Sequence, residues 1–516
     1  MNGADRLCDV LLANDVDVCF ANPGTSEMHF VAALDRKPRM RCVLGLFEGV
    51  VTGAADGYAR MADKPAATLL HLGPGLANGL ANLHNARRAY TPMINVVGDH
   101  ATYHFQHDAP LTSDIESLAR PMSHWVRRIA NAERVGPDTA AAYQAAVSLP
   151  GITTLILPAD AAWGDVSETS IERTLVPKPE PVAVEAVMAA ANAIRSGKRA
   201  ALMLTGRALR ADALEIAGRI AEATGLRLTA QPFNGRVERG VSRVPVARVP
   251  YPIDLALEML RDIDVLILVG AKVPVAFFAY PGKPGRLVPD DCEVIELAQI
   301  GQDLKGALAW LADELGVPSG RPAPVIPSMV ADTLPTGPLT GDAISRVVAR
   351  MMPENAIICD ESVSSGRQFF ALSQNSVPHD YLQITGGSIG IGIPLAAGAA
   401  IACPDRRVIG LQADGSAMYT VQGLWTQARE NLDVITVVFA NRAYAILQGE
   451  MRNVGVNEFG RNAQRMLTLD QPALDWVPMA KGLGVEAGRA TTVEEFVRLF
   501  EGALSRRGPF LIEAVL

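Results

Sequence analysis

The sequence predicts an α/β protein made of three doubly wound domains, each with a parallel sheet. Short β-branched runs alternate with amphipathic helical stretches along the chain, which is typical of parallel sheets covered by helices. Two proline-rich stretches, residues 173–182 and 316–340, interrupt this pattern and indicate linkers. The 516 residues are too many for one ordinary core, so several domains are expected.

Each domain contains its own series of strand candidates. We place the domains at residues 1–172, 183–316 and 340–516. In the first, helices are expected at 5–15, 48–62 and 76–90, and the segment 65–75 is expected to be a strand followed by a loop. In all three domains, apolar runs at strand length predict strands within 16–24, 65–71, 92–100, 199–206, 264–274, 292–298, 355–362, 406–416, 433–442 and 509–516.

The composition excludes several classes of protein. A net charge of −8 gives no basic surface for nucleic acid. Six scattered cysteines, without a CxxC pair, indicate reduced thiols and a cytoplasmic protein. The first twenty residues carry acids within their apolar stretch, so we expect neither a signal peptide nor a membrane span. The glycine-rich apolar segment 386–403 is expected to be the start of a buried helix.

An acid and an amide follow two consecutive strand candidates in the last domain. Asp414 begins the turn Asp414-Gly415-Ser416, and Asn441 ends the next apolar run. A right-handed βαβ crossover would place both at the carboxyl edge of the sheet, where their oxygens suit Mg²⁺. Gly415 and Ser416 would offer a helix start to a phosphate. The alternative is ordinary turn chemistry, because Asp, Asn and Gly are common at strand ends.

At this motif the chain resembles the thiamine diphosphate-dependent enzymes of the 2-oxo acid decarboxylase and acetohydroxyacid synthase family. Their cofactor motif is Gly-Asp-Gly followed, some two dozen residues later, by an Asn pair. Here Ala413 replaces the first glycine and Ala440 the first Asn, and neither change removes a side-chain ligand. The resemblance implies that Asp414, Asn441 and the carbonyl of Ala443 hold Mg²⁺ against the diphosphate.

The resemblance also implies roles for residues upstream. In "TGGSIGIGIP", Gly387 would accept from the aminopyrimidine and Ile389 would hold the cofactor in its V shape, although Ile389 also suits the core. Glu48, in "EGVVTGAADGYAR", would be the catalytic acid, although a glutamate in a helix's first turn also complements the dipole. The remaining cofactor contacts are expected from Ser364, Gly415, Ser416 and Tyr444.

The substrate markers are less specific. Thr25 would face the substrate carboxylate. His71 would be an active-site histidine or a core histidine. His107 would be a proton shuttle or a loop histidine; zinc is disfavoured because His100, His104 and His107 lack a fourth ligand. The central domain carries Phe277, Phe278 and Tyr280 where benzoylformate decarboxylase has a second histidine. Ile446 is expected in the pocket.

The function implied by the resemblance is benzoylformate decarboxylase-like cleavage of a 2-oxo acid, through an enamine, as a decarboxylase or carboligase. One alternative is an acetolactate synthase acting on pyruvate, and another is a non-catalytic cofactor-binding subunit. The resemblance makes residues 1–172 a pyrimidine-binding domain, 183–316 a Rossmann-like domain and 340–516 a diphosphate-binding domain. FAD is unlikely because the central domain lacks GxGxxG. A homodimer is expected at minimum, and a homotetramer is common in the family.

Overall fold

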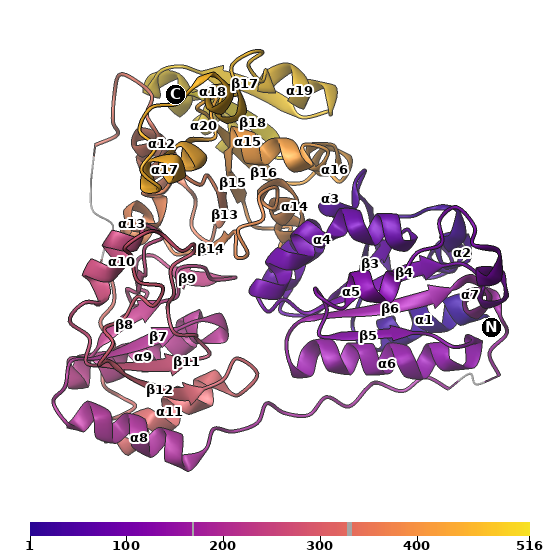
Figure 1. Ribbon diagram of the computed structural model, residues 1–516, viewed down its shortest axis with the longest axis horizontal. Helices are drawn as coiled ribbons and strands as arrows, with labels where there is room; N and C mark the ends of the chain where they lie inside the picture. Colours follow the sequence, from indigo (N-terminus) through magenta and orange to yellow (C-terminus); the bar gives the residue numbers. More distant parts are fainter. Residues whose placement is uncertain (168–169, 328–332) are drawn as a thin grey trace.

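The computed structural model describes residues 1–167, 170–327 and 333–516 and contains three sheets, each flanked by helices (Figure 1). The first has the order β2-β1-β3-β4-β6-β5, with all described pairs parallel. Its strands are β1 (Val18–Asn22), β2 (Arg41–Leu44), β3 (Ala66–Leu70), β4 (Met93–Asp99), β5 (Trp125–Arg128) and β6 (Ile152–Pro158). Its helices are α1 (Gly3–Ala13), η1 (Thr25–Glu27), α2 (Met28–Asp35), α3 (Glu48–Ala62), α4 (Leu72–Arg88), η2 (Thr102–His107), α5 (Ile115–Ala119), α6 (Ala132–Ser148) and α7 (Ala159–Trp163).

The central sheet has the order β10-β8-β7-β11-β12 and is also parallel. Its middle strands are entirely buried apolar runs, as expected for strands covered on both faces. Its strands are β7 (Ala200–Leu204), β8 (Arg227–Ala230), β10 (Ala247–Arg248), β11 (Val265–Val269) and β12 (Glu293–Ala298). Its helices are α8 (Val184–Arg195), η3 (Gly206–Leu209), α9 (Ala211–Thr224), α10 (Ile253–Leu260) and α11 (Leu304–Glu314).

The third sheet has the order β17-β18-β16-β15-β13-β14-β9. Its main strands are β13 (Ile357–Glu361), β14 (His379–Gln383), β15 (Val408–Ala413), β16 (Val434–Ala440), β17 (Glu486–Ala490) and β18 (Phe510–Val515). Its helices are α12 (Gly341–Met351), α13 (Phe369–Leu372), η4 (Ser373–Asn375), α14 (Gly392–Ala402), α15 (Asp414–Ala417), η5 (Met418–Thr420), α16 (Gly423–Arg429), α17 (Ala445–Asn453), α18 (Arg461–Leu467), α19 (Trp476–Gly482) and α20 (Val493–Leu504).

One strand of the third sheet comes from the central part of the chain. β9 (Val237–Arg239) pairs antiparallel with β14, with Tyr381 opposite Val237. The guanidinium of Arg239 lies 3.6 Å from the ring centroid of Phe370, over its face, a cation–π arrangement that ties the added strand to the sheet. The third sheet is therefore parallel except for this one edge strand, and the expected α/β fold with three parallel-dominated sheets is confirmed.

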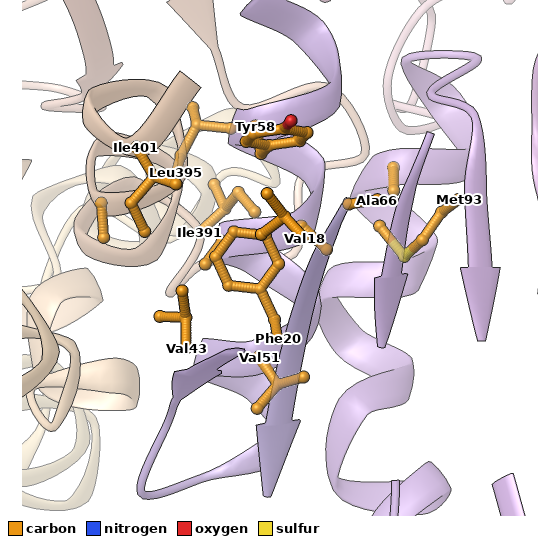
Figure 2. Packing of buried hydrophobic residues seen from close by; sticks show 14 of the residues in the cluster. Val18, Phe20, Val43, Val51, Tyr58, Ala66, Met93, Ile391, Leu395 and Ile401 are labelled. Atoms are coloured by element: carbon orange, nitrogen blue, oxygen red, sulfur yellow. The ribbon is translucent and has the colours of Figure 1, made fainter. Parts of the chain in front are cut away.

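The first and third sheets are joined by a close helix crossing. Buried side chains of α14 pack against those of β1, β2 and α3 (Figure 2). A Cβ atom at Gly398 would lie 1.8 Å from the carbonyl oxygen of Ala54, so only glycine permits this approach. The residues labelled in Figure 2 include Phe20, Val43, Val51, Tyr58, Ile391, Leu395 and Ile401. Within the segment 386–403, the buried helix α14 begins at Gly392, so the expected helix start is present.

One local expectation was wrong. The segment after β3 was expected to be a loop, but α4 begins at Leu72 and includes Gly73, Pro74 and Gly75 in its first turn. Proline is well tolerated in this position, because the first N–H groups of a helix have no intrahelical partner. The carboxyl end of β3 therefore leads directly into a helix start, and His71 is the residue between them.

Candidate active site

Asp414 and Asn441 lie at the carboxyl ends of adjacent strands, as the crossover pattern predicted. β15 and β16 are parallel neighbours, with Ala413 opposite Phe439. Asp414 is 2% exposed, and burial raises its pKa. Its two carboxylate oxygens accept hydrogen bonds from the backbone N–H groups of Gly415 (2.8 Å) and Arg442 (2.6 Å). Each oxygen keeps lone pairs for another partner, so the donor set suits a hard cation such as Mg²⁺.

The surroundings of Asn441 include a residue that the sequence did not single out. The Nδ2 of Asn441 donates to the Oγ of Ser365 at 3.0 Å, and its Oδ1 accepts from the N–H of Ala443 at 3.0 Å. Ser364, the predicted phosphate contact, lines a cavity of about 350 Å³ beside Ile446. Both serines follow β13; the contact of Ser364 with a phosphate stays a prediction, and Ser365 is a neighbour of Asn441 that the sequence did not single out.

Gly415 and Ser416 lie in the first turn of α15, and both are buried. The ring of Tyr444 packs on Gly415, because a Cβ atom there would lie 2.5 Å from Cε1 of the ring. Ala443 forms an isolated antiparallel bridge with Thr468. The predicted diphosphate-side residues therefore form one group at this edge of the third sheet.

The turn that precedes α14 is held by a residue of the first sheet's layer. The Oδ1 of Asn85, on α4, accepts from the N–H of Gly386 at 3.0 Å, and its Nδ2 donates to the carbonyl of Ser388 at 2.6 Å. Gly387 adopts φ +75°, in the region that favours glycine. Ile389 is half-buried. The shape of this turn thus depends on contacts from another part of the chain.

The buried carboxylate of Glu361 also holds the end of this turn. Glu361, the last residue of β13, accepts from the N–H groups of Gly390 (2.7 Å), Ile391 (3.3 Å) and Gly392 (2.7 Å). These amides lead into the N-terminus of α14, where a negative charge is favoured. Burial raises the pKa of Glu361 to about 7, against the opposing effect of the three N–H donors. Glu361 was not predicted, although an acid at a strand end was a usable signal.

We expect the difference in free energy of unfolding between the wild type and Glu361→Gln to become smaller as the pH rises. A carboxyl group whose pKa is about 7 when folded binds its proton more tightly in the folded state, so its contribution falls between about pH 4.5 and pH 7. Thermal unfolding of wild type and Glu361→Gln, measured at pH 5 and pH 7.5, tests this. The difference in Tm between wild type and Glu361→Gln should be smaller at pH 7.5 than at pH 5. The corresponding change in the free energy of unfolding is up to about 3 kcal/mol. A difference that widens would contradict the assignment.

Glu48 is the first residue of α3 and is buried. Its Oε2 accepts from the Nδ2 of Asn78 at 3.0 Å. The Nδ2 of Asn82 donates both to the carbonyl of Gly49 (2.8 Å) and to the carbonyl of Gly390 (3.2 Å). The start of α3 and the turn before α14 are therefore linked within a single chain. Asn82 thus joins the residue next to Glu48 to the end of the turn that contains Gly387.

The three predicted substrate-side residues lie in different settings. Thr25 begins η1, directly after Gly24. The Nδ1 of His71 lies 2.8 Å from Oε2 of Glu27, a residue that the sequence did not single out. His107 is exposed at the end of η2, and its ring centroid lies 5.2 Å from that of His104. Gly75 lies between His71 and Glu48. A Cβ atom built on Gly75 would be 3.1 Å from Oε1 of Glu48 and 3.2 Å from Cβ of His71, so the two side chains are close to each other.

The chain belongs to the thiamine pyrophosphate enzyme family. Residues 1–118 match the model of the N-terminal TPP binding domain of these enzymes, and residues 364–514 match that of the C-terminal TPP binding domain. The chain is thus a thiamine diphosphate-dependent enzyme of the decarboxylase and acetolactate synthase class. Among its described residues, no helix is both long and apolar enough to cross a membrane.

Individual relatives cover nearly the whole chain. IlvX of Mycobacterium tuberculosis, whose name places it provisionally among acetolactate synthase large subunits, is 51% identical, covering 100% of this chain and 99% of the relative. Benzoylformate decarboxylase of Pseudomonas aeruginosa is 29% identical, and the match covers 98% of this chain and 97% of that protein. The 4-hydroxybenzoylformate decarboxylase of Rhodococcus jostii shares the fold, with a TM-score of 0.86 at 24% identity. The match covers 99% of this chain and 98% of that structure.

Proposed function

We propose that this enzyme decarboxylates a 2-oxo acid with an aromatic or bulky apolar side chain, using thiamine diphosphate and Mg²⁺. The observation that carries the proposal is an aromatic ring at the cofactor turn. A Cβ atom at Gly387 would lie 2.6 Å from Cζ of Phe277, so the ring packs directly on the residue expected to bind the aminopyrimidine. A substrate bound beside that turn would contact an aromatic surface.

Phe277 belongs to a cluster of four rings from the central part of the chain. Its ring centroid lies 4.9 Å from Phe278, 5.3 Å from Tyr251 and 5.5 Å from Phe233. Phe277 and Phe278 are 42% and 54% exposed, so they leave apolar surface available to a ligand. Exposed rings of this kind can pair with the ring of an aromatic ligand, which supports an aromatic substrate.

A polar subsite lies beside the cluster. The cavity of about 350 Å³ between α17 and the central part of the chain is lined by Tyr251, Tyr280, Ser364 and Glu450, and its size suits a small ligand. The hydroxyls of Tyr251 and Tyr280 donate to the carboxylate of Glu450 at 3.1 and 2.7 Å. These bonds hold α17, which carries Ile446, against the aromatic cluster.

The residues of the site have separable tasks in this proposal. Asp414, Asn441 and the Ala443 carbonyl would hold Mg²⁺, and the start of α15 would take the diphosphate. Thiamine diphosphate, when bound, serves as the electron sink for the carbon–carbon cleavage. Glu48 would exchange a proton with the aminopyrimidine, and His71 would exchange a proton with the substrate or product.

The direct test is CO₂ release with added thiamine diphosphate and Mg²⁺. A panel of benzoylformate, indole, branched-chain and pyruvic 2-oxo acids, with analysis of the products, distinguishes aldehyde from acyloin. We expect the highest kcat/KM on an aromatic substrate, with an aldehyde as product. Absence of turnover on every 2-oxo acid would refute the proposed activity and favour a non-catalytic cofactor-binding subunit.

Replacing Phe277 by Ala should reduce kcat/KM for the aromatic substrate about 10-fold or more, because a pocket contact of this size is worth 1–3 kcal/mol. The loss for pyruvate should be smaller, since its methyl group offers little area. Trp310→Ala, which truncates a partly exposed ring on α11 of the same sheet layer, is the matched control and should leave both values unchanged. Equal losses for the two substrates with Phe277→Ala would contradict an aromatic subsite.

Acetolactate synthesis is the second candidate, and the relative at 51% identity favours it. It predicts that pyruvate is consumed with acyloin as the main product. In that case the aromatic cluster would cover the site rather than bind substrate, and Phe277→Ala would affect turnover of pyruvate at least as strongly as that of benzoylformate.

The assembly and location are also proposals. We propose a homodimer or homotetramer, because large apolar side chains next to the site are exposed in the single chain, among them Leu46 (46%), Tyr419 (53%) and Leu447 (44%). Such residues are typical of surfaces covered by another subunit. The six cysteines are unpaired in the described residues, which supports a reducing, cytoplasmic location.

A further inference from the structure

We propose that Glu27 is a positioning residue that fixes the ring orientation of His71 and the nitrogen that His71 presents to a ligand. The inference rests on the proposed function, in which His71 acts on the substrate. Glu27 is 3% exposed, and its carboxylate accepts from the N–H of Gly24 (2.8 Å), from the Oγ of Ser26 (2.5 Å) and from Nδ1 of His71 (2.8 Å). A buried carboxylate with these donors has a defined place.

Two glycines provide the space for this pair. A Cβ atom at Gly24 would lie 2.0 Å from Nδ1 of His71, and one at Gly98 would lie 1.8 Å from Oε1 of Glu27. Gly24 follows β1, His71 follows β3, and Gly98 lies near the end of β4; these three strands are neighbours in the sheet. The imidazole and the carboxylate are therefore both packed on backbone, which restricts rotation of either side chain.

The hydrogen bond determines which ring nitrogen is available for chemistry. The oxygen of Glu27 is the acceptor in this pair, so Nδ1 of His71 carries the hydrogen. Nε2 is then the ring nitrogen that is free to exchange a proton with a ligand. The His71 side chain is 21% exposed while that of Glu27 is 1% exposed, so solvent or a ligand can reach the ring but not the carboxylate. Glu27 acts through His71 and does not touch the substrate.

Two carboxylates face this histidine. Glu27 approaches from η1, and Glu48 lies across Gly75 on α3. Ser26 is the neutral neighbour, with its Oγ 3.4 Å from Nδ1. Of the two acids, only Glu27 is hydrogen-bonded to the ring in the described contacts. Glu27→Gln should therefore disturb the contact at Nδ1 of His71 without altering the group across Gly75.

A double-mutant cycle tests whether Glu27 works through His71. On the best substrate of the panel, Glu27→Gln is expected to reduce kcat about 10- to 100-fold, with little change in KM. In a His71→Ala background the same substitution should cost less than about twofold, because its only route to the reaction is gone. An equal loss in both backgrounds would overturn the proposal.

A second measurement does not depend on turnover. Diethyl pyrocarbonate modifies neutral imidazole, and mass spectrometry of the cofactor-free protein gives the rate at His71, with the exposed His107 as internal reference. Glutamine keeps one side-chain oxygen but replaces the other with an amide that donates, so Glu27→Gln should disturb the contact to Nδ1 and raise the His71 rate several-fold at pH 7.5. An unchanged His71 rate, with the His107 rate also unchanged, would refute the proposal.

The two measurements separate this inference from the proposed function. If wild type releases no CO₂ from any 2-oxo acid, the proposed activity fails, while the modification rates still report on Glu27 and His71. If wild type is active but the variant shows neither the non-additive loss nor the faster modification of His71, the positioning role alone is wrong. Glutamine is isosteric with glutamate, and thermal unfolding of each variant confirms that it is folded.

Discussion

Replacing Glu48 by Gln is expected to reduce CO₂ release about 10²- to 10⁴-fold while leaving the affinity for thiamine diphosphate nearly unchanged. Glutamine keeps the size of the side chain and a carbonyl oxygen for the Nδ2 of Asn78, which donates to Glu48 at 3.0 Å. It lacks the proton that a carboxyl group exchanges, and the loss of one acid–base group is commonly worth this factor. Initial rates and calorimetric titration with the cofactor measure the two quantities.

The matched control is Glu185→Gln. Glu185 also lies in the first turn of a helix, α8, but it is exposed. If Glu48 only complements the helix dipole, both variants should lose a few tenths of a kcal/mol of stability and retain activity. Unchanged turnover in Glu48→Gln would therefore refute the catalytic assignment and support the structural alternative that the sequence left open.

The parts of this site that follow from local pattern were predictable from the sequence. Asp414 and Asn441 end two apolar runs separated by a helix, and the crossover rule places such residues at one edge of a parallel sheet. The structure has β15 and β16 as neighbours, as predicted. Glu48 lies in the first turn of α3 for the same reason, because its segment reads as a helix that begins after a strand.

The parts that depend on distant contacts were not predictable in this way. β9 has the polar sequence "VER", without the apolar alternation that marks a strand, and it is ordered by pairing with β14. Glu27 is two residues from the predicted Thr25, but its partner His71 comes from the next strand of the sheet. Whether Ser364 or Ser365 meets Asn441 depends on the turn after β13, where Val363 adopts φ +50°. Periodicity carries no information on such pairings.

Replacing Asp414 by Asn should abolish most of the cofactor affinity. Removing a group that only orients a metal ligand typically lowers metal affinity 10- to 100-fold. Loss of a direct anionic ligand should therefore raise the apparent Kd for thiamine diphosphate, measured with Mg²⁺ present, by more than about 100-fold. Tm measured against cofactor concentration reports the change, because a ligand that binds only the folded state raises the Tm. Wild type should be stabilised by thiamine diphosphate with Mg²⁺, and the variant should not.

Comparing the cofactor-free proteins makes this test specific. Burial raises the pKa of Asp414, so the ionised carboxylate costs the cofactor-free fold stability above its usual pKa. An Asn side chain removes that cost but keeps only one of the two oxygens that accept from Gly415 and Arg442. These effects oppose each other, so the Tm without ligand should change little. Asp405→Asn, which neutralises an exposed acid just before β15, should behave as wild type with and without cofactor. A buried carboxylate that binds a divalent ion cannot be replaced by an amide without loss of affinity for that ion. If the Tm of Asp414→Asn rises with thiamine diphosphate and Mg²⁺ at the same half-saturating concentration as wild type, the cation is held elsewhere.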